Sequence, residues 1–189
     1  MIKPLSAILL HELSKLKDTR QRQKLLRSVI DDDNHFKPID LGLKNGAKTT
    51  IAEGSKIASN RKNTLTIAKN LNKRNIRVAF LSESDTAKSA DAVIEYKGKL
   101  YIAEFKHSTT TKASTIYFDL KNGFKKAQMV VLKVTHADKG HIDSIIDELA
   151  RKNQIMGSLL LVNKLGIEMM FSRKELTSGS YKKKIKGFL

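Results

Sequence analysis

The stretch SADAVIEYKGKLYIAEFKHS, residues 89–108, has two apolar segments on either side of Lys97-Gly98. Alternating segments joined by two such residues predict a β-hairpin. The pairing sets residue 96 against 99 and residue 94 against 101, so that Asp91 lies opposite Glu104. Side chains directly opposite on one face are roughly 5 Å apart at Cβ. The hairpin therefore predicts two carboxylates on one side of a sheet, with Lys106 on the same face as Glu104.

Two carboxylates that lie this close repel each other unless a cation sits between them. Oxygen ligands of this kind suit Mg²⁺, with Mn²⁺ or Zn²⁺ as alternatives. Such an ion can activate a water molecule and stabilise charge on a phosphoryl oxygen. Lys106 could position that water or neutralise the developing charge. The other interpretation is a simple salt bridge between Glu104 and Lys106.

Context distinguishes this acid-x-lysine spacing from two similar ones. Glu95-Tyr-Lys97 abuts the turn, and Asp119-Leu-Lys121 lies on or beside a helix. Only Glu104-Phe-Lys106 ends an apolar strand, which begins at Leu100. We therefore take Glu104 and Lys106 as the candidate pair.

The composition favours a polyanionic partner. The 189 residues include 36 Lys and Arg against 19 Asp and Glu, a net charge of +17, and no cysteine. This charge suits phosphate contacts and counterion release, so nucleic acid is the expected partner. No apolar run approaches the length of a membrane span, and no secretory signal is expected at this N-terminus. The sequence contains no glycine-rich phosphate loop, so no nucleotide cofactor is expected.

The pattern along the chain predicts an α/β domain with a mixed sheet. We expect an N-terminal helical arm over residues 1–45 and the main domain over residues 46–189. Residues 35–50 indicate an irregular connector, and Ile51 to Asn72 indicates a helix. Further elements are expected at Arg77–Leu81 (strand), around Leu120–Ala127 (helix), Met129–Val134 (strand), 141–152 (helix), Ser158–Val162 (strand) and Ile167–Phe171 (strand), before the lysine-rich tail 182–186.

The chain resembles the PD-(D/E)XK nuclease superfamily, with Ala90-Asp91 in the place of "PD" and Glu104-Phe-Lys106 in that of "(D/E)XK". The usual proline is alanine here. The order of elements over about residues 50–172 is similar to the C-terminal toxin domains of contact-dependent growth inhibition and related polymorphic toxin systems. Glu53 fits the helical glutamate of those domains, and Gln128 fits the residue before their Val-rich strand.

The resemblance implies a restriction-endonuclease-like mixed sheet flanked by helices and a metal-dependent phosphodiesterase. It implies Glu53, Asp91 and Glu104 as metal ligands and Lys106 as the base or water-positioning residue. For Glu53, a charge at the N-terminus of a helix is the alternative interpretation.

Three further residues are candidates for nucleic-acid binding. His107 follows Lys106 and points to the other face if the strand continues. Thr109 belongs to a hydroxyl-rich loop that could donate to phosphate, and Lys112 follows it. Surface and loop roles are the alternatives for all three.

The function expected from the resemblance is an endonuclease toxin that cleaves RNA, with tRNA favoured, in the cytoplasm of a target cell after delivery. An acidic immunity protein would neutralise it. A DNA endonuclease, of toxin or of restriction or repair type, is the first alternative. A basic nucleic-acid-binding protein without enzymatic activity is the second.

Overall fold

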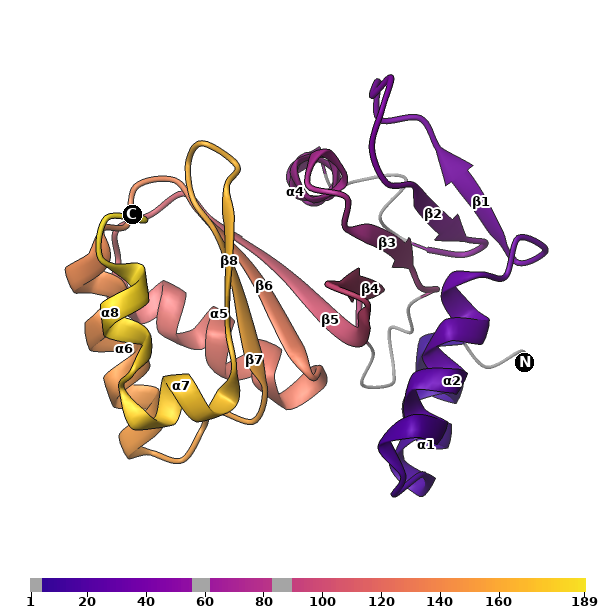
Figure 1. Ribbon diagram of the computed structural model, residues 1–189. Helices are drawn as coiled ribbons and strands as arrows, with labels where there is room; N and C mark the ends of the chain where they lie inside the picture. Colours follow the sequence, from indigo (N-terminus) through magenta and orange to yellow (C-terminus); the bar gives the residue numbers. More distant parts are fainter. Residues whose placement is uncertain (1–4, 56–61, 83–89) are drawn as a thin grey trace. The chain divides into compact units, whose positions relative to one another are not determined.

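A computed structural model describes residues 5–55, 62–82 and 90–189 (Figure 1). The chain divides into two compact units, Met1–Ala103 and Glu104–Leu189. Within the described ranges the strands are hydrogen-bonded in their order along the chain, from β1 to β8. The pairs β2–β3 and β6–β7 are parallel, and β1–β2, β3–β4, β4–β5 and β7–β8 are antiparallel. The prediction of an α/β fold with a mixed sheet and flanking helices is confirmed.

The first unit contains three described helices and the strands β1 to β4. Its elements are α1 (Leu5–Lys15), α2 (Thr19–Ile30), β1 (Phe36–Ile39), β2 (Thr49–Ala52), α4 (Lys62–Lys73), β3 (Arg77–Phe80), β4 (Ala92–Tyr96) and the first half of β5 (Lys99–Ser108). Buried Asn72 links helix α4 to strand β2 and to the residue that precedes strand β3. Its Oδ1 accepts from the Thr49 hydroxyl at 2.7 Å, and its amide donates to the Ile76 carbonyl at 2.9 Å. Because both ends of the amide are satisfied, this buried polar group stabilises the packing of α4 on the strands.

Two local predictions for this unit are wrong. The irregular connector predicted at residues 35–50 is wrong at residues 36–39 and 49–50, where β1 and β2 pair, whereas residues 40–48 between them are irregular. Pro38 lies within β1, which tolerates it because β1 is at the edge of the sheet. The helix predicted from Ile51 is wrong at its start, because Ile51 and Ala52 belong to strand β2. Helix α4 covers Lys62–Lys73, and residues 56–61 lie outside the described residues.

The predicted hairpin is confirmed. Residue 96 pairs with 99 and residue 94 with 101, and the ladder ends at Ala92 and Ala103. Lys97 and Gly98 have φ angles of 49° and 75°, the positive values that a two-residue type I′ turn requires. The predicted pairing of Asp91 with Glu104 lies one residue beyond the ladder and stays a prediction.

Residues of the predicted N-terminal arm are hydrogen-bonded to the hairpin. The Gln23 side chain donates to the Leu100 carbonyl at 2.8 Å and accepts from the Leu100 N–H at 2.9 Å. Arg27 lies 2.7 Å from Glu95, and this hydrogen bond is the main reason that the pKa of Glu95 is lowered. The domain boundary near residue 45 stays a prediction, but α2 packs as part of the first unit.

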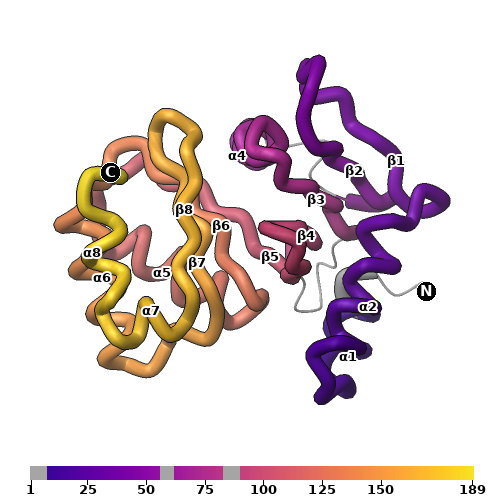
Figure 2. Tube along the Cα trace, in the orientation of Figure 1, coloured from indigo at the N-terminus to yellow at the C-terminus, as the bar shows by residue number. Residues whose placement is uncertain are grey.

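The second unit begins within β5 and places helices on one face of its strands. It contains α5 (Ala113–Lys126), β6 (Met129–Val134), α6 (Lys139–Arg151), β7 (Ser158–Val162), β8 (Glu168–Phe171), α7 (Arg173–Ser178) and α8 (Tyr181–Ile185). Alternate residues of β6 and β7 share a core with all four helices. The predicted strands and the helix at 141–152 are confirmed with small shifts of their ends. The lysine-rich tail forms α8, whose path is visible in Figure 2.

Candidate functional site

Glu104 is a buried carboxylate held by two lysines of the second unit. It lies in the middle of β5 and is 1% exposed. The Nζ atoms of Lys106 and Lys126 lie 2.8 and 3.1 Å from the same atom, Glu104 Oε1. Lys106 comes from the same strand, and Lys126 comes from the last turn of α5. Two cations on one oxygen compensate the burial of this charge.

The second carboxylate oxygen of Glu104, Oε2, is in a different environment from Oε1. Oε2 is buried and has no hydrogen-bond partner among the residues that the structure describes. A buried charged acceptor without a partner is costly, and natural structures contain few of them. Such an atom is suited to bind a cation that arrives with the substrate or from solution.

Asp119 on α5 belongs to the same electrostatic environment. Burial raises the pKa of its half-buried carboxyl, and the positive charge of Lys106 acts in the opposite direction. Lys106 therefore acts on two carboxyl groups, those of Glu104 and Asp119. From the sequence, Asp119 is only part of a helical acid-x-lysine pattern.

Asp91 lies in a bend just before β4 and is 4% exposed. Its N–H donates to the Ala103 carbonyl at 3.1 Å, and its own carbonyl accepts from the Leu81 N–H at 2.9 Å. The backbone of Asp91 is thus fixed against the residue that precedes Glu104 in β5. Its proposed role as a metal ligand stays a prediction.

Glu53 is not on a helix, which corrects the sequence interpretation. It is exposed in a turn that follows β2. The alternative of a charge at the N-terminus of a helix stays a prediction, because residues 56–61 lie outside the described residues. Over residues 5–55, 62–82 and 90–189, no three His, Cys, Asp or Glu side chains gather into a group that could hold a metal ion. The metal site predicted at Glu53, Asp91 and Glu104 stays a prediction, whereas the predicted contact between Glu104 and Lys106 is present.

The candidates for nucleic-acid binding lie around the end of β5. His107 Nε2 is 3.2 Å from the Thr135 hydroxyl, and its pKa is lowered, first by burial and then by Lys133. Thr109 is exposed, and its carbonyl oxygen is 3.0 Å from His136 Nδ1. Lys112 is exposed at the N-cap of α5. Their binding roles stay predictions.

Gln128 immediately precedes β6, as the sequence predicts. Its carbonyl accepts from the Ser158 N–H at 2.9 Å, at the start of the parallel β6–β7 pair. A Cβ on Gly157 would lie 2.3 Å from the same carbonyl oxygen, so only glycine allows this approach. The observed role of the Gln128 backbone is structural.

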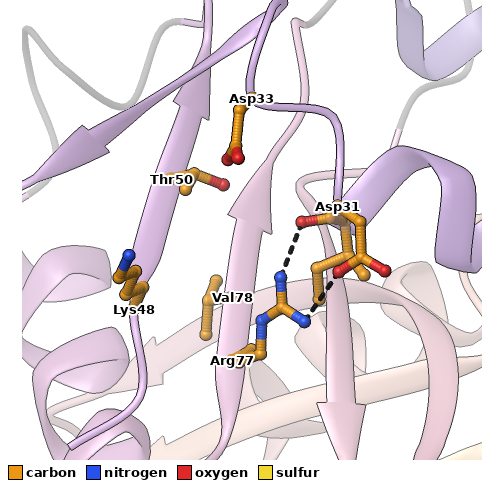
Figure 3. Close-up of a pocket in the computed structure, with 7 residues that line it drawn as sticks. Asp31, Asp33, Lys48, Thr50, Arg77 and Val78 are labelled. Carbon is orange, nitrogen blue, oxygen red and sulfur yellow. Dashed lines mark hydrogen bonds and ion pairs between the residues drawn. The ribbon is translucent and has the colours of Figure 1, made fainter.

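The first unit has a pocket of its own, with a volume of about 180 Å³ (Figure 3). Arg77 is held there by Asp31 at 2.8 Å and by the Ile30 carbonyl at 3.0 Å. Asp33 and Lys48 also line the pocket, so its two cations face two anions. This balance of charge gives the pocket no preference for a polyanion.

Comparison with known proteins gives one structural similarity. Neither a protein-family model nor a curated protein matches the chain. A solved structure titled "CdiA-CT/CdiI toxin and immunity complex from Burkholderia pseudomallei" aligns over 57% of this chain and 80% of that chain, with 18% identity and a TM-score of 0.43. The sequence identity and the TM-score are both too low for this similarity to indicate a function.

No described helix is both long enough and apolar enough to cross a bilayer.

Proposed function

We propose that this chain is a metal-dependent phosphodiesterase that cleaves nucleic acid at Glu104 and Lys106. The observation that carries the proposal is the asymmetry of the Glu104 carboxylate. Oε1 is paired with two lysines, whereas Oε2 is buried and has no partner among the described residues. A metal ligand needs a carboxylate oxygen that no cation of the protein occupies, and among the described residues Oε2 meets this requirement.

In this proposal each residue of the site has a separate role. Glu104 Oε2 binds a divalent ion, Mg²⁺ in the first place, and the sequence register adds Asp91 as a second ligand. Carboxylates are hard oxygen donors that suit this ion. When bound, the ion supplies an activated water molecule and stabilises charge on a phosphoryl oxygen. Lys106 orients the attacking water, and Lys126 keeps the Glu104 carboxylate in place.

The substrate we propose is RNA, with tRNA favoured and DNA as the alternative. The net charge of +17 supports a phosphate-bearing ligand. The resemblance of the Asp91 and Glu104-Phe-Lys106 motifs to toxin nucleases is the basis for the finer proposal. In that proposal the chain acts in the cytoplasm of a target cell and an acidic immunity protein neutralises it.

A second function is favoured by one specific contact. The distance of 2.8 Å between Lys106 and Glu104 is that of an ordinary ion pair. In a basic binding protein without catalysis, this pair would only stabilise β5.

Incubation with total RNA and with plasmid DNA, in Mg²⁺ or in EDTA, separates these functions. A nuclease degrades one of the two substrates in Mg²⁺ and neither in EDTA, and Asp91→Ala and Lys106→Ala abolish the cleavage. A binding protein shifts both nucleic acids in a gel and leaves them intact under every condition. That second outcome would overturn the enzymatic proposal.

A further inference from the structure

A groove between α5 and α6 in the second unit has the composition of a base-stacking site. Its volume is about 350 Å³. The residues that line it are Ala113, Ser114, Tyr117, Phe118, Ser144, Ile145, Glu148 and Lys152. A concave site of this size with aromatic walls and a few polar groups is typical of small-ligand recognition.

Two aromatic side chains of this groove lie beside two lysines, of which Lys152 also lines the groove. The rings of Tyr117 and Phe118 are in edge-to-face contact, with their centroids 5.5 Å apart. Lys121 Nζ lies 5.9 Å from the centroids of both rings, and Lys152 Nζ lies 5.2 Å from that of Tyr117. The aromatic surface is thus flanked by cations at the distance of cation–π contact.

Phe118 is the exposed member of the pair. It is 54% exposed, whereas Tyr117 is 8% exposed and its hydroxyl donates to the Gln154 side chain at 2.6 Å. A phenyl ring on the solvent side of a helix has no role in the core. Because Tyr117 is fixed, it can hold the Phe118 ring in place for a ligand.

The charge around Phe118 selects the class of ligand. Residues three, four and seven positions from Phe118 share its side of the helix. Within α5 these positions include two cations and no acid, and they are Ser114, Thr115, Lys121, Asn122 and Lys125. The acidic residue of the groove, Glu148, is paired with Lys152 at 2.5 Å. The surplus of positive charge beside an exposed aromatic ring fits a ligand with flat rings and phosphates.

We propose that Phe118 is a stacking platform for one base of a single-stranded nucleic acid, with Lys121 beside the adjoining phosphate. Single-stranded binding proteins combine aromatic platforms with cations in this way. A duplex is excluded from this contact because its bases are stacked inside it. The inference rests on nucleic acid being the ligand in the proposed function. It deepens that function, since Asp119, next to Phe118, is acted on by the charge of Lys106.

The sequence permits a direct optical test. The chain contains no tryptophan, so Phe118→Trp introduces a single tryptophan at the platform. A short single-stranded RNA oligonucleotide is titrated in EDTA, where the proposed cleavage cannot occur. The control variant is Leu165→Trp, which places the fluorophore at another exposed site of the same unit, 74% exposed. Inorganic polyphosphate and poly-L-glutamate serve as polyanions without bases.

The expected result is a saturable quenching of the Phe118→Trp variant by RNA, with no such response from the Leu165→Trp variant or with either baseless polyanion. Phe118→Ala should weaken RNA binding by about 5- to 150-fold, the range measured for one base–aromatic stack. The inference is overturned if RNA binds the Phe118→Trp variant without changing its fluorescence, or if Phe118→Ala binds RNA as tightly as wild type. Quenching by poly-L-glutamate to the same extent also overturns it and favours an acidic protein as the occupant.

These outcomes distinguish a failure of the stacking proposal from a failure of the nuclease proposal. If wild type cleaves in Mg²⁺ and Phe118→Ala cleaves and binds equally well, the platform is wrong and the nuclease stands. If RNA quenches the Phe118→Trp variant and wild type cleaves nothing, the platform stands and the nuclease is wrong.

Discussion

Removal of the two lysines around Glu104 should be much more costly together than one at a time. In the single variants Lys106→Met and Lys126→Met, the remaining lysine still contacts Glu104 Oε1. In the double variant the carboxylate is buried with neither lysine. The two substitutions should therefore be strongly non-additive.

The magnitudes follow from the burial of the three side chains. A hydrogen bond to a charged group contributes about 1.5–3 kcal/mol. The lysine side chains are 24% and 38% exposed, which lets water replace part of each contact, so we expect about 1 kcal/mol for each single variant. An unpaired buried charge costs about 3–5 kcal/mol, which is the expectation for the double variant. Adding Glu104→Gln to the double variant should recover most of that loss, because the buried group is then neutral.

Urea unfolding followed by far-ultraviolet circular dichroism measures these free energies. Lys125→Met is the matched control, since Lys125 is the exposed neighbour of Lys126 on the same helix and should change stability by less than about 0.5 kcal/mol. A double variant that loses no more than the sum of the single losses would refute the reasoning. So would a triple variant that is no more stable than the double.

Two further predictions concern the second unit. Gly157→Ala should lower the free energy of unfolding by about 1–3 kcal/mol, because its Cβ would meet the Gln128 carbonyl at 2.3 Å. The control Gly140→Ala, whose Cβ would have its nearest contact at 3.4 Å, should be tolerated. Equal midpoints of urea unfolding for the two variants would contradict this prediction. The pKa of Glu175 is lowered from 4.5 to about 2, mainly by its hydrogen bond from Lys184. Because the folded pKa is the lower one, the contribution is present above about pH 4.5 and is lost as the pH falls toward 2, so Glu175→Gln should flatten the stability profile in that window. An unchanged slope in that variant, measured by thermal unfolding at several pH values, would show that Glu175 is not the group responsible.

The hairpin could be predicted from the sequence because its turn and its alternation are local signals. Lys97-Gly98 can adopt the two positive φ angles, and this fixes the register of β4 with β5. The strands β6 and β7 were predictable from the apolar runs at residues 129–132 and 159–162. The burial of Glu104 and its contact with Lys106 likewise follow from strand spacing.

The strands β1 and β2 could not be predicted, because β1 contains Pro38 and β2 has two threonines in four residues, so neither shows a clear apolar pattern. Their pairing depends on partners elsewhere in the chain, which a local pattern does not contain. The prediction that Glu53 lies on a helix is wrong for the same reason, because strand β2, which directly precedes Glu53, was not recognised.

Lys126 could not be found from the sequence, because it lies 22 residues from Glu104, at the end of a lysine-rich helix. No spacing rule connects a helix terminus to a strand at that separation. Only the packing of α5 brings this ammonium group to the carboxylate.

The central claim is that Glu104 Oε2, which has no partner in the described part of the chain, takes part in cleavage. Single-turnover cleavage of RNA in Mg²⁺ tests this claim most directly. The substrate is the one identified in the incubation with total RNA, and binding of each variant is measured in parallel in EDTA. We predict that Glu104→Gln lowers the cleavage rate by at least about 100-fold with little change in RNA affinity, while the Leu165→Trp control cleaves at the wild-type rate. A Glu104→Gln variant that is folded, binds RNA and cleaves it as fast as wild type would contradict the claim.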